Sequence, residues 1–152
     1  MEIQIVPYEA RYQEAFKALN EEWIVAHFEL EDADRAALND PEKYILQKGG
    51  SIFVALCDDK AIGVCALLKI SDRKYELAKL AVSPSFRGKN IGELLVRRVI
   101  LQAKEAGASA IFLEGNTRLA PSIKLYRKLG FKEVTGYEIT YKRVDIVMEL
   151  AL

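Results

Sequence analysis

The hydrophobic period of the chain changes near residue 51, and this change constrains the fold more than any other feature. Before it, apolar residues such as Phe16, Leu19 and Trp23 recur at helical spacing. After it, residues 51–57 and 61–70 are apolar runs separated by a short polar turn, which predicts two strands joined in a hairpin. The chain therefore combines helices with a sheet.

The remaining elements are predicted from the same patterns. Residues 91–106 place apolar side chains on one face of a long helix, and Gly107 follows where a glycine typically ends a helix. The predicted order is strand, helices, three strands, helix, strand, helix and two strands. These elements cover 3–5, 8–27, 32–38, 42–47, 51–57, 61–70, 76–82, 91–106, 110–113, 121–129, 131–134 and 141–150. The order predicts one α/β or α+β domain over 1–152, with helices on a mixed sheet.

The composition excludes several classes of protein. The 152 residues include 22 Lys or Arg and 22 Asp or Glu, and a formal net charge of zero argues against a general nucleic-acid-binding protein. His27 is the only histidine, so a Cys/His zinc site cannot form, and we expect no metal. The sequence does not open on a signal-peptide pattern, and no apolar run reaches about 18 residues. We therefore expect no membrane partner and a cytoplasmic location.

The turn before the long helix is the segment most typical of a binding site. The first N–H groups of a helix have no intrahelical partners and lie at the positive end of its dipole, which favours an anion, most naturally phosphate. Gly88 and Gly92 allow close backbone approach, and Arg87 and Lys89 add positive charge. Lys89 is followed by Asn90 rather than Ser or Thr, and Gly-x-Gly-x-x-Gly is absent, so neither common nucleotide motif fits.

Two segments resemble the GNAT superfamily of acetyl-CoA-dependent N-acetyltransferases. Residues 87–92, Arg-Gly-Lys-Asn-Ile-Gly, resemble its pyrophosphate loop, Arg/Gln-x-x-Gly-x-Gly/Ala, and residues 125–131 resemble its Leu-Tyr-x-Lys-x-Gly-Phe segment. Asn90 departs from the family's glycine, but asparagine tolerates left-handed backbone better than most residues. The order of elements also fits. The resemblance implies a mixed, mostly antiparallel sheet of about seven strands with flanking helices.

The same resemblance implies transfer of an acetyl group from acetyl-CoA, a co-substrate, to a primary amine by direct attack on the thioester. Tyr126 matches the tyrosine that protonates the leaving thiolate, and Glu76 matches a glutamate used as general base. The residues implied to bind acetyl-CoA are Leu80, Ala81, Val82, Arg87, Gly88, Lys89, Asn90, Ile91, Gly92, Asn116 and Lys128. The acceptor would be a small-molecule amine or a peptide amine. Homodimers are common in the family, so a homodimer is a further expectation.

Each assignment has an alternative that the sequence leaves open. Glu114 is the alternative to Glu76 as the general base. The alternative for Tyr126 is a packing role, and the alternative for Asn116 is a role in a turn. The residues weighed for the acceptor side, each with an ordinary core or surface role as its alternative, are Trp23, His27, Phe28, Glu29, Glu31, Asp32 and Asp34. The alternative to an N-acetyltransferase is a non-catalytic acyl-CoA-binding sensor or scaffold module.

Overall fold

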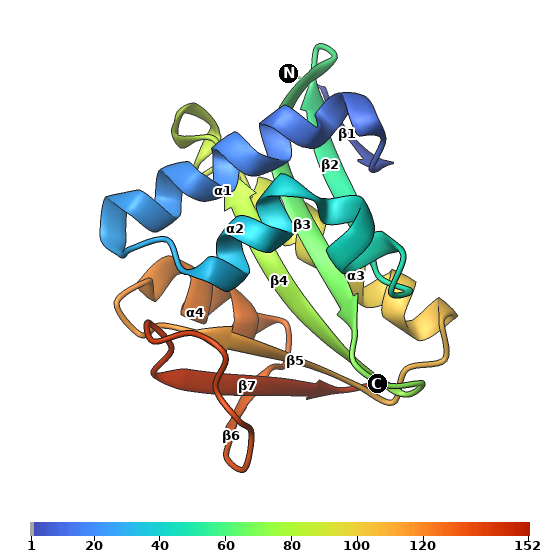
Figure 1. Cartoon of the computed structure of the whole chain (residues 1–152), viewed down its shortest axis with the longest axis vertical. Coiled ribbons are helices and arrows are strands. Elements are labelled where there is room, and N and C mark those ends of the chain that lie inside the picture. The colour runs from blue at the N-terminus through green and yellow to red at the C-terminus, as the bar shows by residue number, and fades with distance from the viewer. Residues whose placement is uncertain (1) are drawn as a thin grey trace.

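A seven-stranded sheet with helices on both faces forms the fold of the computed structural model, which describes residues 2–152 (Figure 1). The sheet order is β1-β2-β3-β4-β5-β7-β6. The strands are β1 (Ile3–Pro7), β2 (Ser51–Cys57), β3 (Lys60–Lys69), β4 (Lys74–Val82), β5 (Ala110–Gly115), β6 (Lys132–Val134) and β7 (Ile146–Ala151). The helices are α1 (Gln13–His27), α2 (Asp32–Asn39), α3 (Ile91–Glu105) and α4 (Ala120–Lys128), with short helical turns at Ala10–Tyr12, Glu42–Leu46 and Pro84–Phe86.

The strand pairing is antiparallel everywhere except between β4 and β5, which are parallel. Parallel neighbours need a crossover connection, and α3 supplies it. The predicted mixed, mostly antiparallel sheet is confirmed, as is the predicted order of its elements. The predicted helix over 8–27 begins later, at Gln13, after the short turn at Ala10–Tyr12.

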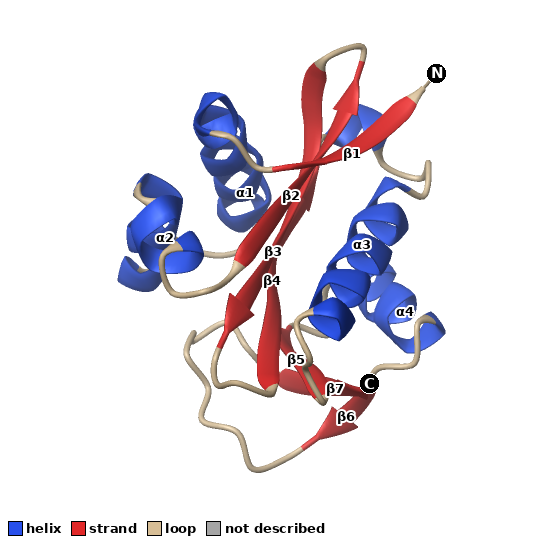
Figure 2. Ribbon diagram, turned by 90° about the vertical axis from the view of Figure 1, so that its right-hand side faces the viewer, coloured by secondary structure: helices blue, strands red, loops and turns tan. Residues whose placement is uncertain are grey.

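The helices form one layer on each face of the sheet. Helices α1 and α2 cover one face, and α3 and α4 cover the other (Figure 2). On α3, Leu95, Val96 and Val99 are buried in one core, while Phe16 of α1 and Leu38 of α2 are buried in the other. The helical spacing of these apolar residues gives each of these helices one buried face.

Strands β4 and β5 pair over only part of their length. Residues 74–76 pair with 110–112, yet β4 continues to Val82 and β5 to Gly115. Within β4, Lys79 adopts a left-handed backbone with φ of 55°, and the β3–β4 register shifts between Val64 and Ala66. A bulge of this kind bends a strand. It lies where β4 separates from β5, and this separation positions the site described below.

The predicted strand over 141–150 is wrong in its first half, because β7 begins at Ile146. Asn116 donates a side-chain hydrogen bond of 2.6 Å to the Arg143 carbonyl, and the Asp145 amide donates one of 3.1 Å to the Gly115 carbonyl. These contacts fix residues 141–145 as a loop. The alternation of apolar residues that starts at Val144 therefore indicated too long a strand.

Candidate active site

A cavity of about 700 Å³ opens between the separated ends of β4 and β5. Its walls come from the end of α1, the second half of β4, the start of α3, the end of β5 and the start of α4. The loop before β7 contributes Arg143 and Val144. The cavity therefore joins elements on both faces of the sheet, and it brings together most of the residues predicted to bind a coenzyme.

The start of α3 forms one end of this cavity. Asn90, which precedes the helix, has φ of 63°, and Gly88 has φ of 75°. Asn90 thus takes the left-handed conformation that its position requires, as expected for asparagine. No side chain caps this helix N-terminus, and the Leu94 amide donates a hydrogen bond of 3.2 Å to the Asn90 carbonyl. The amides before Leu94 are therefore available to a bound anion.

Gly92 leaves space in front of these amides. A Cβ built at Gly92 would meet only Leu125 Cδ2, at an ordinary 3.7 Å, and one built at Gly88 would meet nothing within 4 Å. Packing within the chain does not require glycine at either position. The open space, the uncapped amides and the Arg87 side chain on the cavity wall fit a diphosphate group.

Two of the predicted coenzyme-binding residues lie outside this lining. The Lys89 ammonium lies 5.5 Å from the centre of the Phe86 ring, and the Lys128 ammonium lies 2.6 Å from a Glu93 carboxylate oxygen. Glu93 also pairs with Arg97 at 2.9 Å. Roles for Lys89 and Lys128 in coenzyme binding therefore stay predictions. The remaining predicted residues do line the cavity, and these are Leu80, Ala81, Val82, Arg87, Gly88, Asn90, Ile91, Gly92 and Asn116.

Tyr126 of α4 lines the same cavity, on the side of α3. Its side chain is buried, and its ring packs edge-on against Phe131 with the ring centres 5.8 Å apart. Burial raises the pKa of the Tyr126 hydroxyl, so it remains protonated across the physiological range. A protonated phenol at this place has the chemistry of an acid as well as that of a packing residue.

Glu76 and Glu114 form a pair of carboxyl groups beside the cavity. Glu114 lines it, whereas Glu76 lines a smaller adjoining space of about 60 Å³ that Glu114 also borders. Burial and the negative charge of Glu114 raise the pKa of Glu76 to about 8, although the nearby Lys79 acts in the opposite direction. A Glu114 oxygen accepts a hydrogen bond of 2.6 Å from the Thr140 amide. Once ionised, a carboxylate with a raised pKa is a stronger base than an ordinary one, so Glu76 can accept a proton at mildly alkaline pH.

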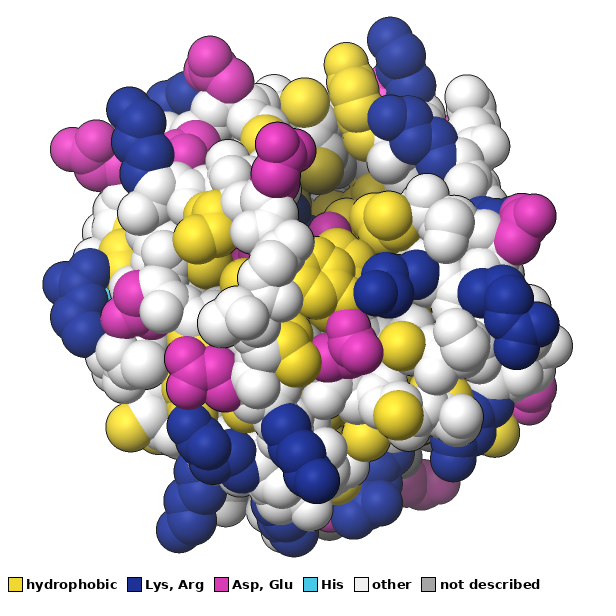
Figure 3. All heavy atoms as spheres, turned by 90° about the horizontal axis from the view of Figure 1, so that it is seen from below, with side chains coloured by type: hydrophobic (Ala, Val, Ile, Leu, Met, Phe, Trp, Pro, Cys, Tyr) yellow, Lys and Arg dark blue, Asp and Glu magenta, His cyan; other side chains and the backbone are white. Residues whose placement is uncertain are grey.

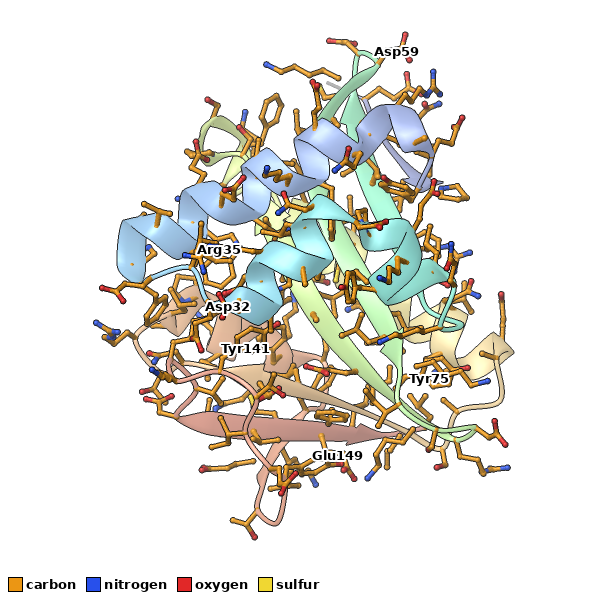
Figure 4. All side chains as sticks on the ribbon, in the orientation of Figure 1. Asp32, Arg35, Asp59, Tyr75, Tyr141 and Glu149 are labelled. Atoms are coloured by element: carbon orange, nitrogen blue, oxygen red, sulfur yellow. The ribbon has the colours of Figure 1, made fainter. Side chains whose placement is uncertain are left out.

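A buried network of charges that sequence reasoning missed lies next to this pair. The Lys79 ammonium donates to Asp34 at 2.5 Å and to the Tyr141 hydroxyl at 3.2 Å. The Arg143 guanidinium donates to both Asp34 oxygens, at 2.7 and 2.8 Å. Burial alone would raise the pKa of Asp34, but the hydrogen bonds from Arg143 and Lys79 lower it to about 2. Tyr141 lies beside the first turn of α2, as Figure 4 shows.

The network also changes the interpretation of the acidic residues after α1. Asp34 is fully buried against Lys79 and Arg143, and Glu31 accepts two hydrogen bonds of 3.1 Å from the Lys142 amide. These carboxylates hold the loop before β7 and are not placed to attract an acceptor from solution. The exposed Asp32 pairs with Arg35 at 2.9 Å. No sequence signal links residues so far apart in the chain.

Asn116 has a clear structural role at the end of β5. Besides its bond to the Arg143 carbonyl, its side-chain oxygen accepts a hydrogen bond of 2.8 Å from the Arg118 amide. The turn predicted as an alternative for Asn116 is therefore present, and contact with a coenzyme arm stays a prediction. Trp23, His27 and Phe28, at the end of α1, also line the cavity.

The surface carries charged side chains of both signs (Figure 3). On the face in Figure 3, basic and acidic side chains are interspersed around apolar ones. Within residues 2–152, no group of three or more His, Cys, Asp or Glu is placed to hold a metal ion. Over the same range, no helix combines the length and the apolar character needed to cross a membrane.

A family model, related sequences and solved structures all show similarity to acetyltransferases. The family model described as "Acetyltransferase (GNAT) family" matches residues 10–131. N-acetylaspartate synthetase from Xenopus tropicalis is 36% identical over 107 residues, which are 69% of this chain and 40% of that protein, so the chain spans less than half of this relative. An acetyltransferase structure from Streptococcus agalactiae is 25% identical, covers 99% of this chain and 98% of its own, and gives a TM-score of 0.86. The PaiA N-acetyltransferase of Thermoplasma acidophilum, solved with coenzyme A, is 21% identical over the full length of both chains, with a TM-score of 0.76.

Proposed function

Because the chain belongs to the acetyltransferase (GNAT) family, we propose that it transfers an acetyl group from acetyl-CoA to a primary amine by direct attack of the amine on the thioester. The observation that carries the proposal is the cavity between β4 and β5. It extends from the uncapped start of α3 to Tyr126 and Glu114. The start of α3, Tyr126 and Glu114 therefore line one continuous space, and Glu76 lies in the smaller space that Glu114 also borders.

In this proposal the start of α3 binds the diphosphate of the coenzyme. The free amides of α3 and Arg87 supply the donors, and Gly88 and Gly92 supply the room. Along β4, residues 80–82 have no partner on the β5 side, although Ala81 and Val82 pair with β3 on the other side. Their free backbone groups can pair with the amides of the pantetheine arm and polarise the acetyl carbonyl.

The acceptor amine must lose a proton before or during the attack. An alkylammonium has a pKa near 10.4, so about one molecule in a thousand is neutral at pH 7. Glu76 takes this proton in the proposed mechanism, and Glu114 is the competing carboxylate beside it. Such proton transfer typically contributes about 10²–10⁴-fold in rate.

The leaving thiolate must gain a proton as the C–S bond breaks. Tyr126 donates this proton from its hydroxyl in the proposed mechanism. The amine nitrogen loses two protons in all, one before the attack and one as the amide forms. One of them is released to solvent, and the other returns Tyr126 to its protonated form through solvent. The products are an acetylated amine and the free thiol of coenzyme A. A position on the cavity wall and a raised pKa, which keeps the hydroxyl protonated, support the assignment of Tyr126.

The experiment that tests this function measures thiol release from acetyl-CoA in the presence of a panel of amines, amino acids and peptides. We expect thiol release that depends on the acceptor, with the acetylated product confirmed by mass spectrometry. Thiol release equal to the rate without acceptor, across the whole panel, would contradict the proposal.

A further inference from the structure

Arg118 lines the cavity, and its guanidinium group packs on Phe28, another lining residue, at the end of α1. Its central carbon lies 4.6 Å from the centre of the Phe28 ring, at the end of α1. A guanidinium that packs on an aromatic face keeps its N–H groups free at the edge of its plane. These N–H groups form a planar fork that matches the two oxygens of a carboxylate.

The backbone around Arg118 is fixed by two side chains. Its own amide donates to the Asn116 side chain at 2.8 Å, and the preceding Thr117 donates to Asp145 through its amide at 2.8 Å and its hydroxyl at 2.6 Å. Across residues 2–152, none of the ion pairs involves the Arg118 guanidinium, whereas Arg143, which also lines the cavity, is bound to Asp34. Within this range Arg118 therefore forms no ion pair, although, after the hydrogen bonds from Thr117, its charge helps to lower the pKa of the exposed Asp145.

The position of this guanidinium separates it from the proposed diphosphate site. Helix α1 lies on one face of the sheet and α3 on the other, as Figure 2 shows. The Arg118 guanidinium packs against the end of α1, while the uncapped amides belong to the start of α3. The Glu114 carboxyl group, which lies at the end of β5 just before the Arg118 turn, lines the same cavity.

We propose that the acceptor is a small amine with a free carboxylate, such as an amino acid, and that Arg118 determines this specificity by binding the carboxylate. The inference rests on the proposed acetyl transfer. Arg118 would hold the carboxylate end of the acceptor, and the carboxyl groups of Glu114 and Glu76 would face its ammonium end. A simple alkylamine would fill the cavity without pairing the guanidinium, so it would gain less from binding.

The test compares each of a set of amino acids with its own carboxamide as acceptor. The amino group of the carboxamide has a lower pKa than that of the acid, so a larger fraction of it is neutral. Intrinsic reactivity therefore favours the carboxamide as acceptor. We expect kcat/KM to be about 10- to 100-fold higher for the acid in the wild-type protein, because charge-assisted hydrogen bonds contribute on that scale. The Arg118→Gln variant should remove this preference by raising the KM of the acid. The Arg118→Lys variant should retain part of the preference.

Two controls make the test specific. The Arg73→Gln variant removes an exposed arginine in the turn before β4, outside the cavity lining, and should leave both acceptors unchanged. The KM of acetyl-CoA should be the same in Arg118→Gln and wild type. If Arg118→Gln instead weakens acetyl-CoA binding and keeps the preference for the acid, the guanidinium serves the coenzyme and the inference is wrong.

The outcomes also separate this inference from the proposed function. If the wild-type protein acetylates the carboxamides as well as the acids, or better, the role of Arg118 is overturned. The proposed acetyltransferase function would still stand. No acceptor-dependent thiol release from any amine would overturn the function, and the inference with it.

Discussion

The Lys79 ammonium lies 2.5 Å from an Asp34 oxygen, with 5% of the Lys79 side chain and none of the Asp34 side chain exposed. Lys79 is also the residue whose left-handed backbone marks the bulge in β4. The ion pair therefore ties the point where β4 separates from β5 to helix α2. Through Arg143, it also holds the loop that walls the cavity.

Removing the Asp34 carboxylate should destabilise the protein strongly. Asp34→Ala would leave the buried Lys79 ammonium and the Arg143 guanidinium without their partner, and the loss of one member of a buried ion pair typically costs about 3–5 kcal/mol. Asp32→Ala, on the same helix but fully exposed, is the matched control and should change stability by less than about 0.5 kcal/mol. Urea denaturation gives both values. Equal stability of the two variants would contradict a structural role for the pair.

Glu76 should control the pH dependence of the reaction. Its pKa of about 8 lies above the ordinary 4.5, so the base form appears only as pH rises, and kcat/KM should increase up to about pH 8 and then level off. Glu76→Gln should lower kcat by about 10²–10⁴-fold and remove this rise. The matched control is Glu133→Gln, an exposed residue of β6. If the rise disappears in Glu114→Gln and survives in Glu76→Gln, Glu114 is the base.

The same pKa has an effect on stability with a determined sign. The folded state holds the Glu76 proton up to about pH 8, whereas the unfolded chain releases it near 4.5. The contribution of Glu76 to stability is therefore fully present below about pH 4.5 and is lost as pH rises through about 8. The difference in unfolding free energy between wild type and Glu76→Gln should shift in favour of the variant over this window. A difference that does not change with pH would argue against the raised pKa.

Tyr126→Phe should lower kcat while leaving acetyl-CoA affinity nearly unchanged. The variant keeps the ring that packs against Phe131 and removes only the hydroxyl that would protonate the thiolate. Tyr44→Phe, which alters an exposed tyrosine, is the control. Steady-state kinetics with a separate binding titration distinguishes the two effects. An unchanged kcat in Tyr126→Phe would show that the tyrosine has only a packing role.

Asn90 should be replaceable by glycine but not by alanine. Its φ of 63° lies in the left-handed region, where a residue with a Cβ other than Asn or Asp costs about 1–2 kcal/mol. Asn90→Gly should therefore retain coenzyme affinity, and Asn90→Ala should lower the melting temperature or the affinity. Thermal unfolding with and without coenzyme A measures both. Identical behaviour of the two variants would exclude a conformational role for Asn90.

The order of elements was predictable because it depends on local patterns. Apolar spacing predicted α3, and the uninterrupted run of residues 51–57 predicted β2 with the bounds that the structure has. The turn before α3 was predictable as well, since glycines and basic residues there indicate an anion site. Asn90 took the backbone conformation expected of it.

The rest of the site depends on contacts between residues that are far apart in the sequence. Lys79 has a left-handed backbone without being glycine, so no local signal marks the bulge in β4. Its partner Asp34 lies 45 positions earlier, among carboxylates that look like ordinary surface residues. The loop before β7 was predicted as a strand because its bonds to Asn116 and Asp34 cannot be seen in the alternation of apolar residues.

Calorimetric titration of acetyl-CoA into the wild-type protein and two Gly92 variants tests the coenzyme site most directly. Gly92→Ala adds only a Cβ, which meets Leu125 at 3.7 Å, and should bind. Gly92→Asp places a negative charge at the start of α3, where it favours the helix but repels a diphosphate. We predict that wild type and Gly92→Ala bind acetyl-CoA, and that Gly92→Asp binds at least about tenfold more weakly while melting no lower than wild type. Absence of binding to wild type, or equal binding to Gly92→Asp, would contradict the assignment of α3 as the coenzyme site.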